Sequence, residues 1–206
     1  MKLARIALAF AAAALLSCQG GAFGGGSTES VRGVWLLVPA ESSIWFVGIK
    51  NNAVAVPGSF TGLEGGIDVA KSEAWVEVRV ATLGTGDEKR DENLRTHFFD
   101  AVNYPVARFA ATGIPHADAL PPIGADLTTT LTGKLTIRGK EFPLELPVRV
   151  THLSANRLRV RNVKPLVLSA KDLGLEQALA VLKAVCGHEA LSGAVPVEID
   201  VVFTPI

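Results

Sequence analysis

Hydrophobic and polar residues alternate along most of the chain from Val31 onward, and a period of two is typical of β-strands with one covered face. The clearest alternating stretches are AWVEVRVA (74–81), TLTGKLTIRG (130–139), LELPVRV (144–150), RLRVRNV (157–163) and VPVEIDVVF (195–203). Glycine and proline turn signals separate them. About seven to nine such strands in roughly 170 residues predict an all-β fold, a sandwich or an up-and-down antiparallel barrel.

The apolar positions of each strand define the face that we expect to point into the protein, because successive side chains of a strand point to opposite sides. These inward positions are Val76, Val78, Val80, Leu135, Ile137, Val148, Val197 and Ile199. The same alternation says which face is covered, and it leaves open whether a ligand or the protein's own side chains cover it.

Two segments break the period of two and predict short helices. In residues 87–99, Asp87 is a good N-cap, and Leu94 and Phe98 stand four residues apart on one helix face. In residues 173–187, an apolar stripe precedes Gly187, a residue that commonly ends helices. The members of that stripe are Leu175, Ala178, Leu179, Leu182 and Val185. We expect both helices to pack on or across the mouth of a barrel.

The N-terminus predicts export and anchoring. Residues 1–18 have two basic residues, an apolar run and a small residue before Cys18, as a secretory signal peptide does. The ending Leu-Leu-Ser-Cys resembles a bacterial lipobox, which implies that Cys18 is acylated and becomes the mature N-terminus. Gln19 after the cysteine implies the periplasmic face of an outer membrane. The alternative is ordinary cleavage near the same site, which gives a secreted periplasmic protein.

Residues 19–30 are rich in glycine and serine, which predicts a flexible tether of about 20 Å average reach before a domain that spans 31–206. Lys and Arg together number 20, as do Asp and Glu, so no excess positive charge supports nucleic-acid binding. No spacing of histidine and cysteine suits a metal site, and no catalytic pattern is evident around Cys186 and His188. We therefore predict a protein that is not an enzyme and has no cofactor or metal.

Three longer motifs follow one another along the chain: ESSIWFVGIKNNAVAVPGSFTGLEGGID near the start, TGDEKRDENLRTHFFDAVNYPVARF (85–109), and LTGKLTIRGKEFPLELPV (131–148). In this order they resemble the motifs of the YceI-like family. The resemblance covers about residues 39–204. The chain departs from the family at Lys50 and Asn51, where a histidine stands in relatives, and this departure leaves the identity of a ligand open.

The resemblance implies an eight-stranded antiparallel, lipocalin-like barrel with two short helices, which holds a polyisoprenoid or another long-chain lipid. Aromatic side chains offer large apolar areas, so we expect ligand contacts near a mouth from these and one aliphatic residue. The predicted contacts are Trp45, Phe60, Phe98, Phe99, Phe109 and Ile137. The alternative is a scaffold or partner-binding lipoprotein whose barrel is solid and self-packed. Nothing in the pattern decides between a monomer and a dimer.

The charged segment GTGDEKRDENLRTHFFDAVNYP (84–105) is the most polar stretch of the chain. We interpret it as a structural clasp that closes one end of the barrel, with Arg90 and Asp91 paired to neighbours or to backbone carbonyls. Phe98 and Phe99 are expected to point inward. The alternatives are an active-site loop, which lacks a poised acid–base pair, and a docking surface for a partner.

Overall fold

The computed structural model describes residues 33–115 and 119–206 of the 206-residue chain. The predicted signal peptide (1–18), the acylation site Cys18, the tether (19–30) and the first two residues of the predicted domain lie outside the described residues. Their roles therefore stay predictions. In the described part of the chain, no helix is both long enough and apolar enough to span a membrane.

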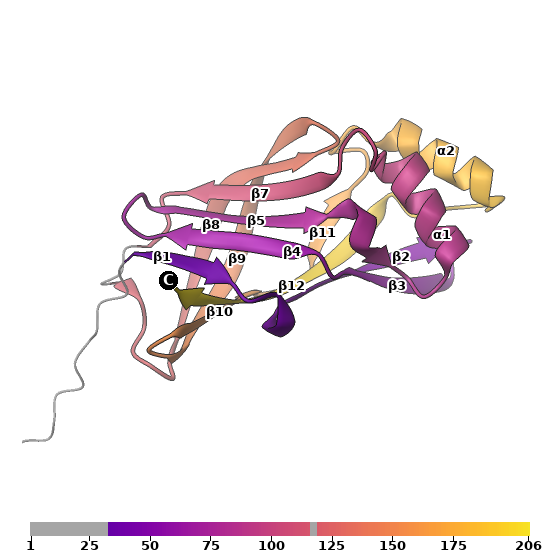
Figure 1. The fold of residues 1–206 in the computed structure, drawn as a ribbon. Coiled ribbons are helices and arrows are strands. Elements are labelled where there is room, and N and C mark those ends of the chain that lie inside the picture. The colour runs from indigo at the N-terminus through magenta and orange to yellow at the C-terminus, as the bar shows by residue number, and fades with distance from the viewer. Residues whose placement is uncertain (1–32, 116–118) are drawn as a thin grey trace, which may run out of the picture.

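The described residues form one antiparallel sheet with helical insertions (Figure 1). The strands are β1 (Val34–Leu37), β2 (Ser43–Lys50), β3 (Val54–Phe60), β4 (Leu63–Asp68), β5 (Glu73–Arg79), β6 (Leu83–Gly84), β7 (Val106–Thr112), β8 (Asp126–Ile137), β9 (Lys140–Ser154), β10 (Arg157–Asn162), β11 (Leu166–Ser169) and β12 (Ala194–Pro205). The helical elements are η1 (Pro39–Glu41), η2 (Val80–Thr82), α1 (Glu88–Asn93), η3 (Leu94–Phe99) and α2 (Glu176–Cys186).

The sheet closes into a barrel. Its strand order is β1, β4, β5, β7, β8, β9, β10 and β12, and β12 pairs again with β1. The remaining segments extend these strands: β2 pairs with the same strand β12 as β1 does, and β11 pairs with β12 as β10 does. Closure leaves the barrel strands without free edges. The predicted eight-stranded antiparallel barrel with two short helices is confirmed.

Apolar residues of neighbouring strands lie opposite one another on the inner face of the sheet. This pairing explains why the register of the strands is well defined. In the long β8–β9 hairpin, Leu131 lies opposite Leu146 and Leu127 lies opposite Val150. A one-residue slip would turn all of these side chains to the solvent. The buried core that results runs around the inside of the barrel, and Val148 is only 1% exposed.

The turn of the β8–β9 hairpin connects the barrel to the helices. Arg138 and Gly139 form this turn with positive φ values of 49° and 70°. A Cβ atom on Gly139 would stand 2.8 Å from the Tyr104 ring, so glycine suits both the backbone conformation and the space. The Arg138 guanidinium donates a 3.0 Å hydrogen bond to the carbonyl oxygen of Phe98, at the end of η3.

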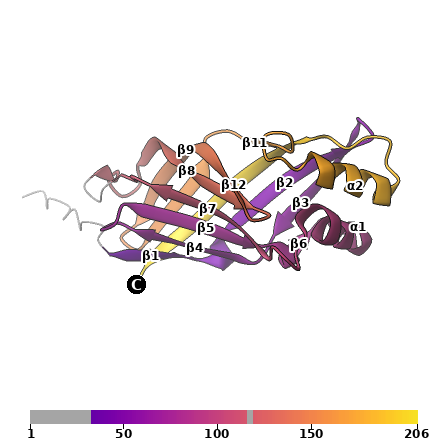
Figure 2. The same cartoon turned by 90° about the horizontal axis from the view of Figure 1, so that it is seen from above.

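Both helices lie at one end of the barrel, as predicted (Figures 1 and 2). The segment with α1 and η3 connects β6 to β7, and α2 connects β11 to β12, while α2 packs against both α1 and η3. The chain enters the barrel at the opposite end, where β1 begins. We call the two ends the helix end and the entry end.

The helices differ from the prediction in detail. The first follows its predicted limits, and the Asp87 side chain accepts a hydrogen bond from the Arg90 backbone N–H, but residues 94–99 form a π-helical turn. The second helix begins at Glu176, three residues later than predicted, because Gly174 has a φ of 56° that ends the preceding turn. Val185 does not belong to the buried stripe, since it is 49% exposed.

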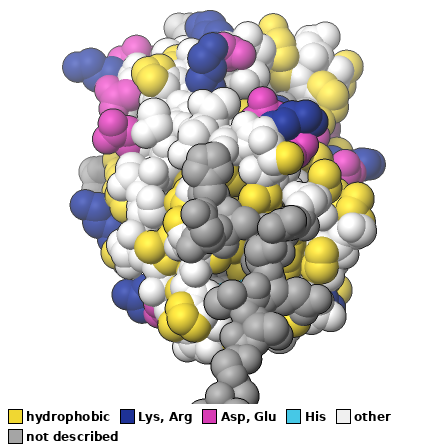
Figure 3. Space-filling view, turned by 90° about the vertical axis from the view of Figure 1, so that its left-hand side faces the viewer, with side chains coloured by type: hydrophobic (Ala, Val, Ile, Leu, Met, Phe, Trp, Pro, Cys, Tyr) yellow, Lys and Arg dark blue, Asp and Glu magenta, His cyan; other side chains and the backbone are white. Residues whose placement is uncertain are grey.

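Figure 3 looks onto the entry end of the molecule. Charged side chains lie mainly around its outer edge, and hydrophobic side chains lie between them. Two described residues between β7 and β8 lie at this end: Ile114 is buried and Leu120 packs against the core. They supply an apolar floor to the barrel interior.

Candidate functional site

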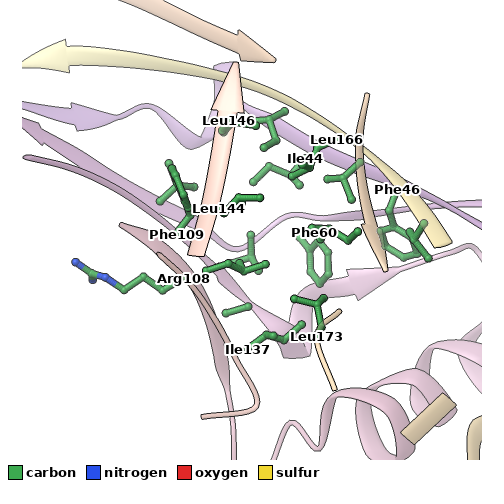
Figure 4. Close-up of a pocket in the computed structure, with 18 of the residues that line it drawn as sticks. Ile44, Phe46, Phe60, Arg108, Phe109, Ile137, Leu144, Leu146, Leu166 and Leu173 are labelled. Atoms are coloured by element: carbon green, nitrogen blue, oxygen red, sulfur yellow. The ribbon is translucent and has the colours of Figure 1, made fainter. Parts of the chain in front are cut away.

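The barrel encloses an apolar cavity of about 360 Å³. It runs from the floor at Ile114 and Leu120, along the inner faces of the strands, to the space beneath α1, η3 and α2. Figure 4 shows how side chains from opposite walls, such as Ile44 and Phe109, point into it. Its volume falls within the range of about 300–1,000 Å³ that is common for small-molecule sites.

Many inward side chains are only partly buried, which is unusual for the inside of a solid barrel. Val76, Val78, Phe109 and Leu131 all point inward and pack against the core, yet each keeps accessible surface. They line the cavity, so the surface that they keep faces its interior. The predicted inward face is therefore correct for these strands, and the interior is not filled by the protein's own side chains.

Four phenylalanine rings form a continuous row at the helix end of the cavity. The Phe46 and Phe60 centroids are 5.6 Å apart, those of Phe60 and Phe99 are 6.1 Å apart, and those of Phe99 and Phe98 are 5.0 Å apart. The last two pairs meet edge to face, an arrangement that aromatic rings prefer. The row offers a rigid apolar wall to a chain-like ligand.

Five of the predicted contact residues line this cavity, namely Phe60, Phe98, Phe99, Phe109 and Ile137. The placement of Trp45 is a correction: its side chain is 51% exposed, and it lies in a separate outer groove beside Arg149 and Arg161. Successive residues of β2 point to opposite faces, and Ile44 and Phe46 occupy the inner one. Whether any lining residue contacts a ligand stays a prediction.

Phe46 is a lining residue that our prediction missed. Its neighbour Trp45 was chosen for its size, whereas the alternation that starts from apolar Ile44 assigns Phe46 to the inside. Opposite Phe46 on β3 stands Gly58, where an added Cβ would come within 2.3 Å of the ring. The glycine therefore provides the space that the inward phenylalanine needs.

The predicted clasp residues meet at Thr85. Arg90 donates from Nε to Thr85 Oγ1 at 2.7 Å and from Nη2 to the Thr85 carbonyl oxygen at 3.0 Å. Asp91 is 4% exposed and accepts hydrogen bonds from the Thr85 backbone N–H at 2.9 Å and from its hydroxyl. Arg95 lies 4.0 Å from Asp91, as its spacing predicts. These contacts connect α1 to the end of β6.

Several cationic and polar side chains gather at the helix end of the cavity. Lys50 from β2, Arg90 from α1, and Cys186, His188 and Ser192 from the segment after α2 all contribute to its lining. Among the described residues, no carboxylate lines the cavity, and no group of three or more His, Cys, Asp or Glu side chains could hold a metal ion. The lining of the cavity is otherwise almost entirely apolar.

Comparisons with known proteins agree with this architecture. A family model described as the YceI-like domain matches residues 35–203. Among solved structures, the chain is similar to a polyisoprenoid binding domain from Saccharophagus degradans implicated in plant cell wall breakdown. The identity is 26% and the TM-score 0.79, and the match covers 84% of this chain and 98% of that one.

The fold is also similar to that of Burkholderia cenocepacia BcnA, with 23% identity and a TM-score of 0.59. That match covers 81% of this chain and 98% of the other. No curated protein sequence matches the chain. Since the family model spans most of the chain and the described residues build the expected barrel, the chain belongs to the YceI-like family.

Proposed function

We propose that this protein is a lipid-binding module of a bacterial cell envelope, which holds one long-chain lipid or isoprenoid in its barrel. The observation that carries this proposal is the continuous apolar cavity of about 360 Å³. Transfer of apolar surface from water into such a cavity is favourable at about 25 cal/mol per Å², so an extended hydrocarbon chain gains steadily along its length.

The relative from Saccharophagus degradans supports the same ligand class, since that domain is described as polyisoprenoid binding. The lining supports binding without a reaction, because it presents almost only aliphatic and aromatic carbon. A self-packed scaffold, the other function considered from the sequence, requires a filled interior, and the partly buried inward side chains weigh against it.

The proposal includes the location of the protein. Acylation of Cys18 would place the barrel at the periplasmic face of the outer membrane, and residues 19–30 would keep it within a short distance of the lipid surface. A barrel in that position can receive a hydrophobic molecule from the membrane and shield it from water.

Lipid extraction tests this function. The full chain is purified from its own membrane in detergent, extracted with organic solvent, and its noncovalent lipids are quantified by mass spectrometry. A second lipoprotein from the same membrane, purified in the same detergent, gives the background. We expect one lipid species at near one molecule per protein and well above background. A lipid profile equal to the background in repeated preparations would refute the proposed function.

A further inference from the structure

The charged side chains that line the cavity in the described part of the chain all have one sign. Lys50, Arg90, Arg108 and His188 contribute to the lining, and among the described residues no carboxylate does. Arg108 is already engaged, because it pairs with Glu77 and lies 4.8 Å from the Trp75 ring centroid. Figure 4 shows its guanidinium pointing away from the cavity. The cations that remain are all at the helix end.

The backbone holds this polar end together. The segment after α2 returns to the end of β2, where the Asn51 N–H donates to the Ala190 carbonyl and the Ser192 N–H donates to the Ile49 carbonyl, both at 2.8 Å. The backbone of Lys50 also forms an isolated antiparallel β-bridge with the backbone of Leu191. His188 and Ser192, which line the cavity, are thereby placed at the same end of β2 as Lys50.

Three carboxylates of α1 have partners of their own. Asp91 accepts from Thr85, while Glu88 and Glu92 lie 3.0 Å and 3.7 Å from Arg95. Glu189 is exposed and does not line the cavity.

Asp87 is the carboxylate of this end that interacts with Lys50. The backbone N–H of Arg90 chiefly lowers the pKa of Asp87, and the charges of Arg90 and Lys50 contribute less. Asp87 does not line the cavity, and within the described chain no carboxylate oxygen lies within 4.0 Å of the Lys50 ammonium. Lys50 is therefore a cation at the edge of an apolar cavity, and no carboxylate of the described residues forms a direct ion pair with it.

We propose that the helix end of the cavity is a head-group subsite that selects amphiphiles with an anionic carboxylate or phosphate head. Lys50 supplies the opposite charge and His188 a ring nitrogen, while the hydrocarbon tail extends past the phenylalanine row into the barrel. This inference rests on the proposed function and adds to it the polarity and the orientation of the ligand.

The selection has a simple physical cause. An ionised head group beside apolar surface is costly unless it is paired and hydrogen-bonded, and Lys50 provides that pairing at the polar end only. A neutral alcohol of the same chain length gains the same burial of its tail and gains nothing from the charge. The difference in affinity between the acid and the alcohol therefore measures the head-group contact separately from the burial of the tail.

Matched ligand pairs test the proposal. The delipidated full chain is loaded with the neutral dye N-phenyl-1-naphthylamine, which is displaced at about pH 8 by hexadecanoate or hexadecanol, and by geranylgeranyl phosphate or geranylgeraniol. We expect an anionic ligand to bind about tenfold more tightly than its alcohol. The first pair tests the preference for a carboxylate head on a fatty chain, and the second tests the preference for a phosphate head on an isoprenoid chain.

In the Lys50→Gln variant, the affinities for the acid and for its alcohol should become nearly equal. Lys183→Gln, which removes an exposed lysine of α2 outside the cavity lining, is the matched control and should keep the preference. Equal affinities in the wild type for both pairs, or a preference that survives Lys50→Gln, would overturn the subsite while leaving the lipid-binding function intact. Absence of binding by all four ligands would instead overturn the proposed function and this inference with it.

Discussion

At the scale of single residues, Thr85, Arg90 and Asp91 form the most closely connected polar group of the helix end. The Thr85 hydroxyl accepts a hydrogen bond from Arg90 and donates one to Asp91. Each of the three side chains therefore has a hydrogen-bond partner within the group. Asp91 is buried, and a buried polar group that loses its partner costs more than the hydrogen bond itself contributed. This is the physical basis for a structural role of the segment, which was predicted from its charge pattern.

Replacement of Asp91 by alanine tests that role. It would leave the Thr85 N–H and hydroxyl without their acceptor, and we expect a loss of about 1–3 kcal/mol in the free energy of unfolding. Chemical denaturation of the purified variant measures it. Glu92→Ala on the same helix, at an exposed position, should change stability by less than about 0.5 kcal/mol. An Asp91→Ala variant with unchanged stability and no ligand binding would instead indicate a functional role.

At the scale of elements, strand β2 shows that alternation predicts which side chains face inward, whereas the choice of lining residues by their size alone does not. The period of two correctly separates the covered from the exposed face, and the order of Ile44, Trp45 and Phe46 assigns Trp45 to the outside. Trp45 was predicted inside because of its large aromatic area alone. Helical spacing placed Val185 in the buried stripe of the second helix, whereas it is exposed and Cys186 is the residue of that turn that lines the cavity.

Other features of the elements could not be predicted from the pattern. The chain is interrupted between β1 and β2 and between β3 and β4. At the second interruption stands Gly62, where an added Cβ would lie 2.7 Å from the side chain of Thr82 in η2. Such contacts join residues that are distant in sequence. The polar end of the cavity was not predicted for the same reason, since Lys50, Arg90 and His188 come together only through the closure of the barrel.

The pairing of Phe46 with Gly58 leads to a prediction at this scale. Gly58→Ala places a methyl group within 2.3 Å of the ring, so Phe46 must move, and we expect a loss of about 1–3 kcal/mol from overpacking. The control is Gly84→Ala, where no atom lies within 4 Å of the added Cβ and φ is not in the left-handed region. Thermal denaturation of both variants measures this loss. Equal melting temperatures would show that the Phe46 ring moves without a loss of stability.

At the scale of the whole molecule, the two ends of the barrel have different roles. The chain enters at one end, the helices and the polar part of the cavity lie at the other, and the apolar interior connects them (Figures 1 and 2). The inward faces could be predicted because alternation is visible in the sequence, whereas the same pattern allowed a sandwich or a barrel, and the family resemblance implied the barrel. The volume of the interior could not, because it depends on how side chains from opposite walls fit together.

Anchoring is the first prediction at this scale, and it concerns a residue outside the described part of the chain. Cys18→Ser removes the acylation site, so the protein should move from the membrane fraction to the soluble periplasmic fraction, because two or three acyl chains are needed for stable attachment. Cell fractionation with immunodetection measures the change. Cys186→Ser, which leaves Cys18 in place, is the control and should stay with the membrane. A wild type that is already soluble would contradict the lipoprotein assignment.

If a lipid occupies the space inside the barrel, a side chain that narrows this space should displace the lipid. Val197 of β12 points into the cavity, and Val167 of β11 is 59% exposed, so Val197→Phe and Val167→Phe make the same chemical change inside and outside. Bound lipid and melting temperature are measured together on wild type and both variants. We predict that Val197→Phe loses lipid yet folds with little loss of stability relative to the delipidated wild type, and that Val167→Phe keeps its lipid. A Val197→Phe variant destabilised by about 1–3 kcal/mol, with no lipid in any of the three preparations, would mean a solid core and would contradict the account.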